Sequence, residues 1–423
     1  MAKADQATTA RLLADAPWLR ADALVTVLET LAREGGDARV VGGSVRNALI
    51  GAPITDIDIA TPLLPAAVME RAARAGLSVH PTGIEHGTVT IVSDGHPFEV
   101  TTLRRDVETD GRRAVVAFSS DWREDAARRD FTMNALYANA SGEVFDYFGG
   151  IEDLAARRVR FIGDAHERIR EDYLRILRFF RFNAQIGQGP PDAQGLAACV
   201  ALKDGLARLS SERIGVEMMK LLAAPRAGEV VAVMAQCSIL TRVLGRDTYP
   251  DRLSRLIAIE QACGLAPDPI ARLAVLALES SAGASHLATH LRLSNAEAEA
   301  LGAAARRHSA YEPQTPEAEA HRWLYKTGRE NFLRGALNSW ASSAASPADE
   351  ARKERAFLAQ RWAIPAMPVR GADVLALGVK AGPGVGEILR AFEEWWMEAG
   401  FPADATQHKS MLQGLAAKSL PNR

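Results

Sequence analysis

The chain has 423 residues, of which 48% are hydrophobic and 24% are charged, and its formal net charge at pH 7 is −2. This length and apolar content allow substantial cores in more than one domain. The balanced charge excludes a generic polycationic coat for nucleic acid, so any RNA binding must use a local basic surface.

The cysteine spacing and the hydropathy of the chain indicate the cellular compartment in which the protein works. Cys199, Cys237 and Cys263 lack CxxC spacing and lie in apolar helical contexts, which predicts buried free thiols. The N-terminal segment is polar and lacks the apolar region of a secretion signal, and no apolar run reaches the length of a membrane span. We therefore expect a cytoplasmic protein that does not enter a membrane.

The first third of the chain predicts a small mixed sheet flanked by helices. Helical patterns cover Thr8 to Arg33 and Pro65 to Ala75. Short apolar runs predict strands near residues 39–42, 56–61, 78–81, 87–93 and 97–103. The polar segment from Arg104 to Glu124 has no clear period. We interpret it as a mobile loop at the active site, although a plain surface hairpin fits its composition equally well.

After about Gly150 the strand patterns nearly vanish. Apolar residues recur at three and four positions, which predicts helices throughout. The sequence thus indicates an α+β chain with a mixed-sheet head and an all-α remainder. We divide it into a head (1–150), a helical neck (151–215), a helical body (216–345) and a helical tail (346–423).

Two aspartates in the head suggest a metal site. The run from Arg39 to Thr61 reads RVVGGSVRNALIGAPITDIDIAT. Side chains alternate along a strand, so Asp56 and Asp58 would share one face while Ile57 and Ile59 point into the core. Two like charges on one face repel each other. A divalent cation such as Mg²⁺, which takes carboxylate and phosphate oxygens, would remove that conflict.

The glycines before this pair suggest a phosphate site. Gly42 and Gly43 allow a tight turn, and Ser44 is a suitable N-cap for a helix from Val45 to Leu49. Helix N-termini attract phosphate, and Arg46 would add a fork of donors. An ordinary surface turn would explain the glycines alone, but not the aspartates that follow them.

A second pair lies in the predicted neck. On a helix from about Ile169 to Phe182, Asp172 and Arg175 would be neighbours on one face. A carboxylate that accepts from an exocyclic amine and a guanidinium that donates to a ring nitrogen fit both cytosine and adenine. The alternative is an exposed ion pair that contributes little stability.

These motifs form an ordered set, together with a strand that carries Glu99, RRDFTMNA from Arg128 to Ala135, and Asp146 followed by Gly149 and Gly150. The set resembles the bacterial class II tRNA nucleotidyltransferase (CCA-adding enzyme) and poly(A) polymerase family. The family pattern reads GGxVRD, and Asn47 stands where aspartate is usual. Asparagine keeps a hydrogen-bonding oxygen there but cannot form a salt bridge.

The resemblance implies template-independent addition of CMP and AMP, from CTP and ATP, to the 3′ end of tRNA. Asp56 and Asp58 would hold two Mg²⁺ ions, with Glu99 as the candidate third carboxylate. Base choice would fall to Asp172 and Arg175. The remaining expected nucleotide-binding residues are Gly42, Gly43, Ser44, Arg46, Arg129, Arg178 and Arg181.

Three alternatives remain open. A poly(A) polymerase shares these motifs, but that branch usually carries a GRRFR-like stretch where this chain has Thr82 to Thr88, TGIEHGT, which resembles the CCA-adding pattern. An enzyme that adds only A would work beside a CC-adding partner. A catalytically silent tRNA-binding protein is disfavoured by the intact acidic and Asp172–Arg175 pairs.

Overall fold

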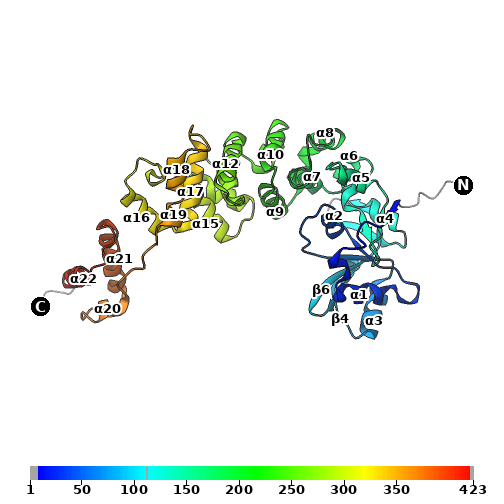
Figure 1. Cartoon of the computed structure of the whole chain (residues 1–423), viewed down its shortest axis with the longest axis horizontal. Coiled ribbons are helices and arrows are strands. Elements are labelled where there is room, and N and C mark those ends of the chain that lie inside the picture. The colour runs from blue at the N-terminus through cyan, green and yellow to red at the C-terminus, as the bar shows by residue number, and fades with distance from the viewer. Residues whose placement is uncertain (1–7, 111–112, 420–423) are drawn as a thin grey trace. The chain divides into compact units, whose positions relative to one another are not determined.

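The computed structural model describes residues 8–110 and 113–419 of the chain (Figure 1). The chain divides into two compact units, residues 1–246 and 247–423. The four-part division predicted from the sequence is finer than this and stays a prediction. Among the helices that the structure describes, none combines the length and apolar composition of a membrane span.

The first unit contains the mixed sheet that the sequence predicts. Within the described residues it has eight strands in the order β1-β10-β9-β2-β3-β6-β5-β4, and of these pairs β3 and β6 run parallel while the others are antiparallel. The strands are β1 Thr8–Ala10, β2 Arg39–Val41, β3 Asp58–Thr61, β4 Ser78–Gly83, β5 Thr88–Ser93, β6 His96–Thr102, β9 Leu136–Ala138 and β10 Val144–Asp146.

Two helix predictions in the head have different outcomes. The segment from Pro65 to Ala75 is confirmed as α3, Pro65–Arg74. The single helix from Thr8 to Arg33 is wrong, because Thr8–Ala10 pairs with β10 as a strand and α1 begins only at Asp22 and ends at Ala32. A three-residue strand is too short to show a period, and its partner lies more than 130 residues away.

The polar segment after β6 is a hairpin and not an irregular loop. Strands β7, Arg104–Asp110, and β8, Arg113–Phe118, pair antiparallel, and α4, Trp122–Ala127, follows. Residues 111 and 112 lie outside the described residues. The surface-hairpin interpretation is therefore the one that the structure supports.

The central strands have one buried face and one face that carries acidic groups. Ile59, Ile91 and Val100 have no more than 1% of their surface exposed, and α1 and α3 contact β5. On the opposite side of β3 and β6, Asp58 lies next to Glu99 in the parallel register. The strand alternation thus presents two carboxylates away from the core.

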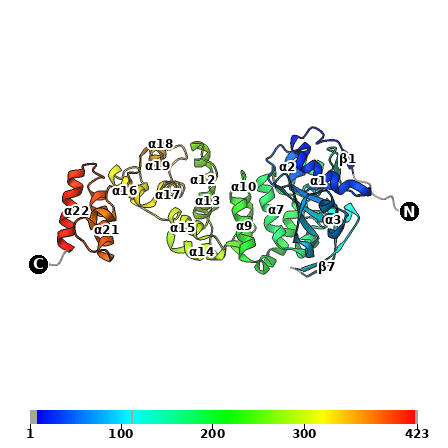
Figure 2. The same cartoon turned by 90° about the horizontal axis from the view of Figure 1, so that it is seen from below.

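The rest of the first unit is helical within the described residues. Its α-helices are α2 Gly43–Leu49, α5 Gly150–Ala155, α6 Ala165–Glu171, α7 Leu174–Gln185, α8 Ala193–Leu202, α9 Ser211–Leu222, α10 Ala227–Gln236 and α11 Ile239–Leu244. Helix α7 contacts α9 and α10 (Figure 2). Phe161 stacks on Phe179 of α7 at 5.5 Å between ring centroids, and Phe131 contacts both Phe161 and Phe182. These ring contacts pack α7 against the segment that carries RRDFTMNA.

The second unit is all-α within the described residues, as predicted. Its helices are α12 Pro250–Cys263, α13 Pro269–Ala277, α14 Ala284–His290, α15 Asn295–Ala304, α16 Glu317–Thr327, α17 Arg329–Ser342, α18 Glu350–Ala356, α19 Leu358–Arg361, α20 Gly371–Leu375, α21 Pro383–Glu398 and α22 Ala405–Ser419. Helices α21 and α22 share an apolar cluster that includes Phe392, Trp396 and Leu412. The three cysteines are free thiols, of which Cys199 is buried.

Asp146 stabilises the junction between β10 of the sheet and α5. Its buried carboxylate accepts hydrogen bonds from the backbone N–H groups of Phe148, Gly149, Gly150 and Ile151 at 2.9–3.1 Å. Gly150 must approach closely, because a Cβ there would lie 2.3 Å from the carbonyl oxygen of Thr132. This contact holds α5 against the RRDFTMNA segment.

We predict that Asp146→Asn destabilises the first unit by about 1–3 kcal/mol, since the amide keeps one oxygen for the N–H groups of Phe148, Gly149 and Gly150 but turns an NH₂ group toward the Ile151 N–H, which loses its acceptor. The measurement is the free energy of unfolding of that unit by chemical denaturation. Asp164→Asn is the control, because Asp164 is an exposed N-cap that accepts from the Glu167 N–H. Equal effects of the two substitutions would contradict the role of Asp146.

Candidate active site

Asp56 and Asp58 lie together at the start of β3. Both line a cavity of about 530 Å³ in the first unit, together with residues of α2 and α7. The strand begins at Asp58 and not at residue 56, so Asp56 belongs to the preceding loop. Ile59 is fully buried, as predicted. Ile57 is also expected in the core, but it is only partly buried, so this prediction is wrong.

The environment of Asp58 suits a cation. Burial raises the pKa of the Asp58 carboxyl, and the carboxylates of Glu99 and Asp56 add to this, while Arg129 opposes them. A divalent ion would offset the repulsion, and two carboxylates with phosphate oxygens form a donor set that hard cations accept. Within residues 8–110 and 113–419, no group of three or more His, Cys, Asp or Glu side chains is close enough to hold a metal ion. Glu99 as a third ligand therefore stays a prediction.

The double glycine forms a turn against Arg129. Gly42 has a φ of +75°, and a Cβ there would lie 3.3 Å from Arg129 Nη1. Helix α2 begins at Gly43 with Gly42 as N-cap, so the prediction that Ser44 caps the helix is wrong. Ser44 is 3% exposed, and its hydroxyl donates to the Val41 carbonyl oxygen. The glycine alone supplies the backbone conformation that the turn needs.

Arg46 is held on three sides at the cavity wall. Its Nε and Nη2 donate to Asn47 Oδ1 at 3.1 and 2.8 Å, and its Nη1 donates to Asn134 Oδ1 at 2.6 Å. The guanidinium lies 4.9 Å from the centre of the Phe182 ring. Burial, with Arg181 as the next cause, lowers the pKa of Arg46 to about 10. It remains a cation at neutral pH.

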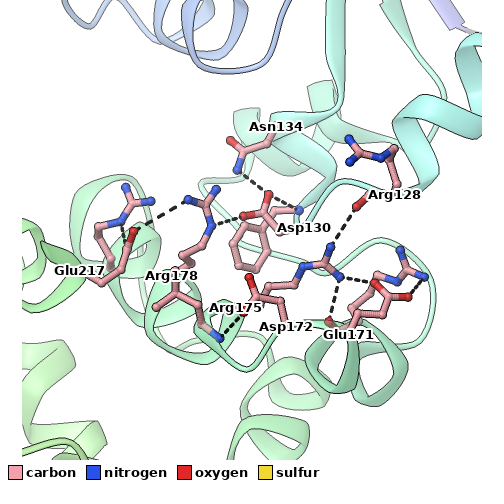
Figure 3. A network of polar contacts seen from close by, with 12 residues as sticks. Arg128, Asp130, Asn134, Glu171, Asp172, Arg175, Arg178 and Glu217 are labelled. Atoms are coloured by element: carbon pink, nitrogen blue, oxygen red, sulfur yellow. Dashed lines mark hydrogen bonds and ion pairs between the residues drawn. The ribbon is translucent and has the colours of Figure 1, made fainter. Parts of the chain in front are cut away.

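Asp130 connects this wall to α7 (Figure 3). It is 7% exposed, and its carboxylate accepts from Asn134 Nδ2, the Phe131 N–H and Arg178 Nε at 2.9, 2.9 and 2.6 Å. Burial alone would raise the pKa of Asp130, but Arg178 and these hydrogen bonds hold it below its usual value. Asp130 is thus an ionised buried acid.

Arg178 and Arg181, both expected to bind nucleotide, are each paired with a carboxylate of the protein. Arg178 pairs with Asp130, and Arg181 Nε donates to the buried carboxylate of Glu217 on α9. Arg181 also lines the cavity and lies 3.9 Å from the Phe182 ring centre. Their predicted contact with a nucleotide stays a prediction.

The predicted recognition helix is broken. Helix α6 ends at Glu171, Asp172 has extended backbone angles (φ −153°, ψ 106°), and α7 begins at Leu174. The cause is local, because Asp172 Oδ1 accepts from the Leu174 N–H, a side-chain-to-backbone bond that competes with a continuous helix. Asp172 and Arg175 are therefore not neighbours on one helical face.

These two residues have different partners. Asp172 Oδ2 accepts from Arg213 Nη2 of α9 at 2.6 Å. Arg175 donates to the Glu171 carboxylate and to the carbonyl oxygens of Arg168 and Arg128, at 2.5, 2.8 and 3.0 Å (Figure 3). Its side chain is only 13% exposed. The alternative of an exposed Asp172–Arg175 ion pair is wrong, because the two side chains have separate partners.

Sequence reasoning missed four residues around the site. Asn134 lies inside the RRDFTMNA motif but was given no role. Gln185 and Lys220 line the cavity, and Arg213 pairs with Asp172. Gln185, Lys220 and Arg213 belong to no motif, so only the packing of α7 and α9 reveals them.

Comparison with known proteins identifies the family. The model of the poly A polymerase head domain matches residues 38–160, and one described as a probable RNA- and SrmB-binding site of polymerase A matches residues 191–246. The mitochondrial CCA tRNA nucleotidyltransferase 1 of Mus musculus is 32% identical over 386 residues, which are 90% of this chain and 87% of that protein. A CCA-adding enzyme of Bacillus cytotoxicus is 43% identical over 47% of this chain and 49% of its own length.

A solved structure agrees over nearly the whole chain. The crystal structure of the Bacillus stearothermophilus CCA-adding enzyme in complex with CTP has a TM-score of 0.69 and 28% identity, and it covers 94% of this chain and 98% of its own. The chain belongs to the family of CCA-adding tRNA nucleotidyltransferases and poly(A) polymerases, and it is an enzyme of the nucleotidyltransferase class.

We predict that Arg175→Ala lowers the free energy of unfolding of the first unit by about 2 kcal/mol, because it removes charge-assisted hydrogen bonds from a mostly buried side chain. Arg213→Ala should cost less, since the Arg213–Asp172 pair is 38% and 30% exposed. Thermal and chemical denaturation of the two variants test this order. A larger loss of stability for Arg213→Ala than for Arg175→Ala would show that the hydrogen bonds of Arg175 do not hold α6, α7 and the Arg128 segment together.

Proposed function

We propose that this chain adds CMP and AMP, from CTP and ATP, to the 3′ end of tRNA without a template. The observation that carries the proposal is that Asp56 and Asp58 line one cavity with Arg46 and Gly43. This is the arrangement that nucleotidyl transfer needs, with carboxylates for cations beside cationic groups for a triphosphate. The relatives named above carry the same activity in their names.

Asp56 and Asp58 would hold the divalent cations, which we propose to be two Mg²⁺ ions. When bound, they would lower the pKa of the attacking 3′-hydroxyl and neutralise the departing pyrophosphate. Groups of the chain itself would bind the triphosphate. Arg46 would bind triphosphate oxygens from a fixed position, and Gly43 would let them approach the backbone of α2. Arg181 and Lys220 add positive charge to the same cavity wall.

Asp172 and Arg175 would select the base. A carboxylate can accept several hydrogen bonds, so Asp172 has lone pairs left beside those used by Leu174 and Arg213. One of them would accept the exocyclic amine of cytosine or adenine. Three of the five N–H groups of Arg175 donate to the partners named above, and one of the others would donate to the ring nitrogen. Uracil and guanine would present a carbonyl to Asp172 and be rejected.

Three parts of the proposal go beyond membership of the family. Full CCA addition is favoured over A-only addition or polyadenylation because the relatives described above are CCA-adding enzymes by name. We place the enzyme in the cytoplasm, as the sequence suggests, although the mouse relative is mitochondrial by name. The tail, residues 346–423, is proposed to bind tRNA.

We predict that Asp58→Asn reduces nucleotide incorporation more than about 100-fold, because even indirect partners of a metal contribute 10- to 100-fold. Affinity for tRNA should change little, since the RNA is held elsewhere. Single-turnover incorporation with Mg²⁺ and a filter-binding assay measure the two quantities. Asp94→Asn, in an exposed turn of the same sheet, is the matched control. Lost tRNA binding with retained turnover would contradict the assignment.

A second experiment separates full CCA addition from the alternatives. Labelled CTP or ATP is offered to tRNAs that end at the discriminator base, at C and at CC, and we expect extension of all three. Extension of the CC-ending tRNA alone would identify an A-adding enzyme. Long A tracts on unrelated RNA would identify a poly(A) polymerase.

A further inference from the structure

Asn47 uses both ends of its side-chain amide. Its oxygen accepts from Arg46 Nε and Nη2, and its nitrogen donates to the carbonyl oxygen of Pro53 at 2.8 Å. Its backbone carbonyl accepts from the Ala52 N–H at 2.9 Å. One residue therefore joins the cationic side chain of α2 to the segment that follows that helix.

That segment leads directly to the catalytic carboxylates. Ala52, Pro53, Thr55 and Asp56 all line the cavity, and no regular strand holds them before Asp58. Asp56 accepts a hydrogen bond from the Thr55 hydroxyl at 3.0 Å, a neighbour in the same segment. The contact at Pro53 thus connects this exposed stretch to α2.

We propose that Asn47 is a positioning residue that fixes Arg46 and the Asp56 segment relative to each other. The inference rests on the proposed function, in which Arg46 binds triphosphate and Asp56 binds the cation. Because both groups act on the same substrate, the distance between them must be set before the substrate binds. The Asn47 amide sets it from within the protein.

The chemistry of the position requires an amide. An aspartate, which the motif usually carries, would still accept from Arg46. It could not donate to Pro53, and its carboxylate would face a carbonyl oxygen with no proton between them. Asparagine is the residue that serves both contacts at this length of side chain. The departure from GGxVRD therefore adds a contact to this chain.

Two substitutions separate the two contacts. Asn47→Asp should keep the KM for CTP within about twofold, because the bonds to Arg46 remain. Its kcat should fall about 2- to 12-fold, the effect of one lost hydrogen bond. Asn47→Ala loses both contacts, so its KM should rise as well. Deuterium uptake of a peptide covering residues 50–57 should increase in both variants.

Asn331→Asp provides the matched control. It makes the same change of charge at an asparagine that accepts from Arg334 in the second unit. It should leave kinetics and uptake at 50–57 unchanged. The proposal is overturned if Asn47→Asp matches the wild type in kcat and uptake, or if its loss lies entirely in KM. If the wild type transfers no nucleotide, the proposed function fails instead, and the exchange data still test the contact.

Discussion

The ion pair between the buried Asp130 and the partly buried Arg178 is the interaction on which the site depends. Burying a single charge is costly, so Asp130 requires Arg178 and the hydrogen bonds around it. Asp130 orients Asn134, and Asn134 in turn accepts from Arg46. Arg178 belongs to α7, whose Phe179 and Phe182 pack on Phe131 of the RRDFTMNA segment. A change at this pair would therefore move Arg46 and α7 together.

The arginine side chains around the cavity are held in place before any substrate binds. Burial and the nearby Arg181 and Arg178 lower the pKa of Arg46, and burial and Arg178 lower that of Arg181, while Asp130 and Glu217 offset the repulsion between these cations. Groups fixed in this way need no reorganisation when charge arrives, which is how preorganised sites stabilise a transition state. Asp130 and Glu217 pair with two of these arginines, and their negative charge allows the guanidinium groups to lie close together.

The sequence predicts most of the head because its motifs are local. The central strands, α3, the Asp56 and Asp58 pair and the glycine turn each follow from a few adjacent residues. Most of the features that the sequence does not predict depend on residues far away in the chain, as Thr8–Ala10 becomes a strand only because β10 is there. The helix break at Asp172 is a local exception, because the Asp172 side chain accepts from the Leu174 N–H. The partners of Arg175 and Arg213 depend on how α6, α7 and α9 pack, which no spacing rule contains.

The two adjacent glycines of the turn are constrained by different things. Gly42 has a positive φ and lies against Arg129, so the protein's own backbone demands it. At Gly43 a Cβ would meet only Arg46 Nη2, at an ordinary 3.8 Å. The folded chain could accept alanine there without strain. A methyl group at that point would occupy space in the cavity that Gly43 lines. Glycine at position 42 is thus a requirement of the fold, whereas glycine at position 43 is a requirement of whatever fills the cavity.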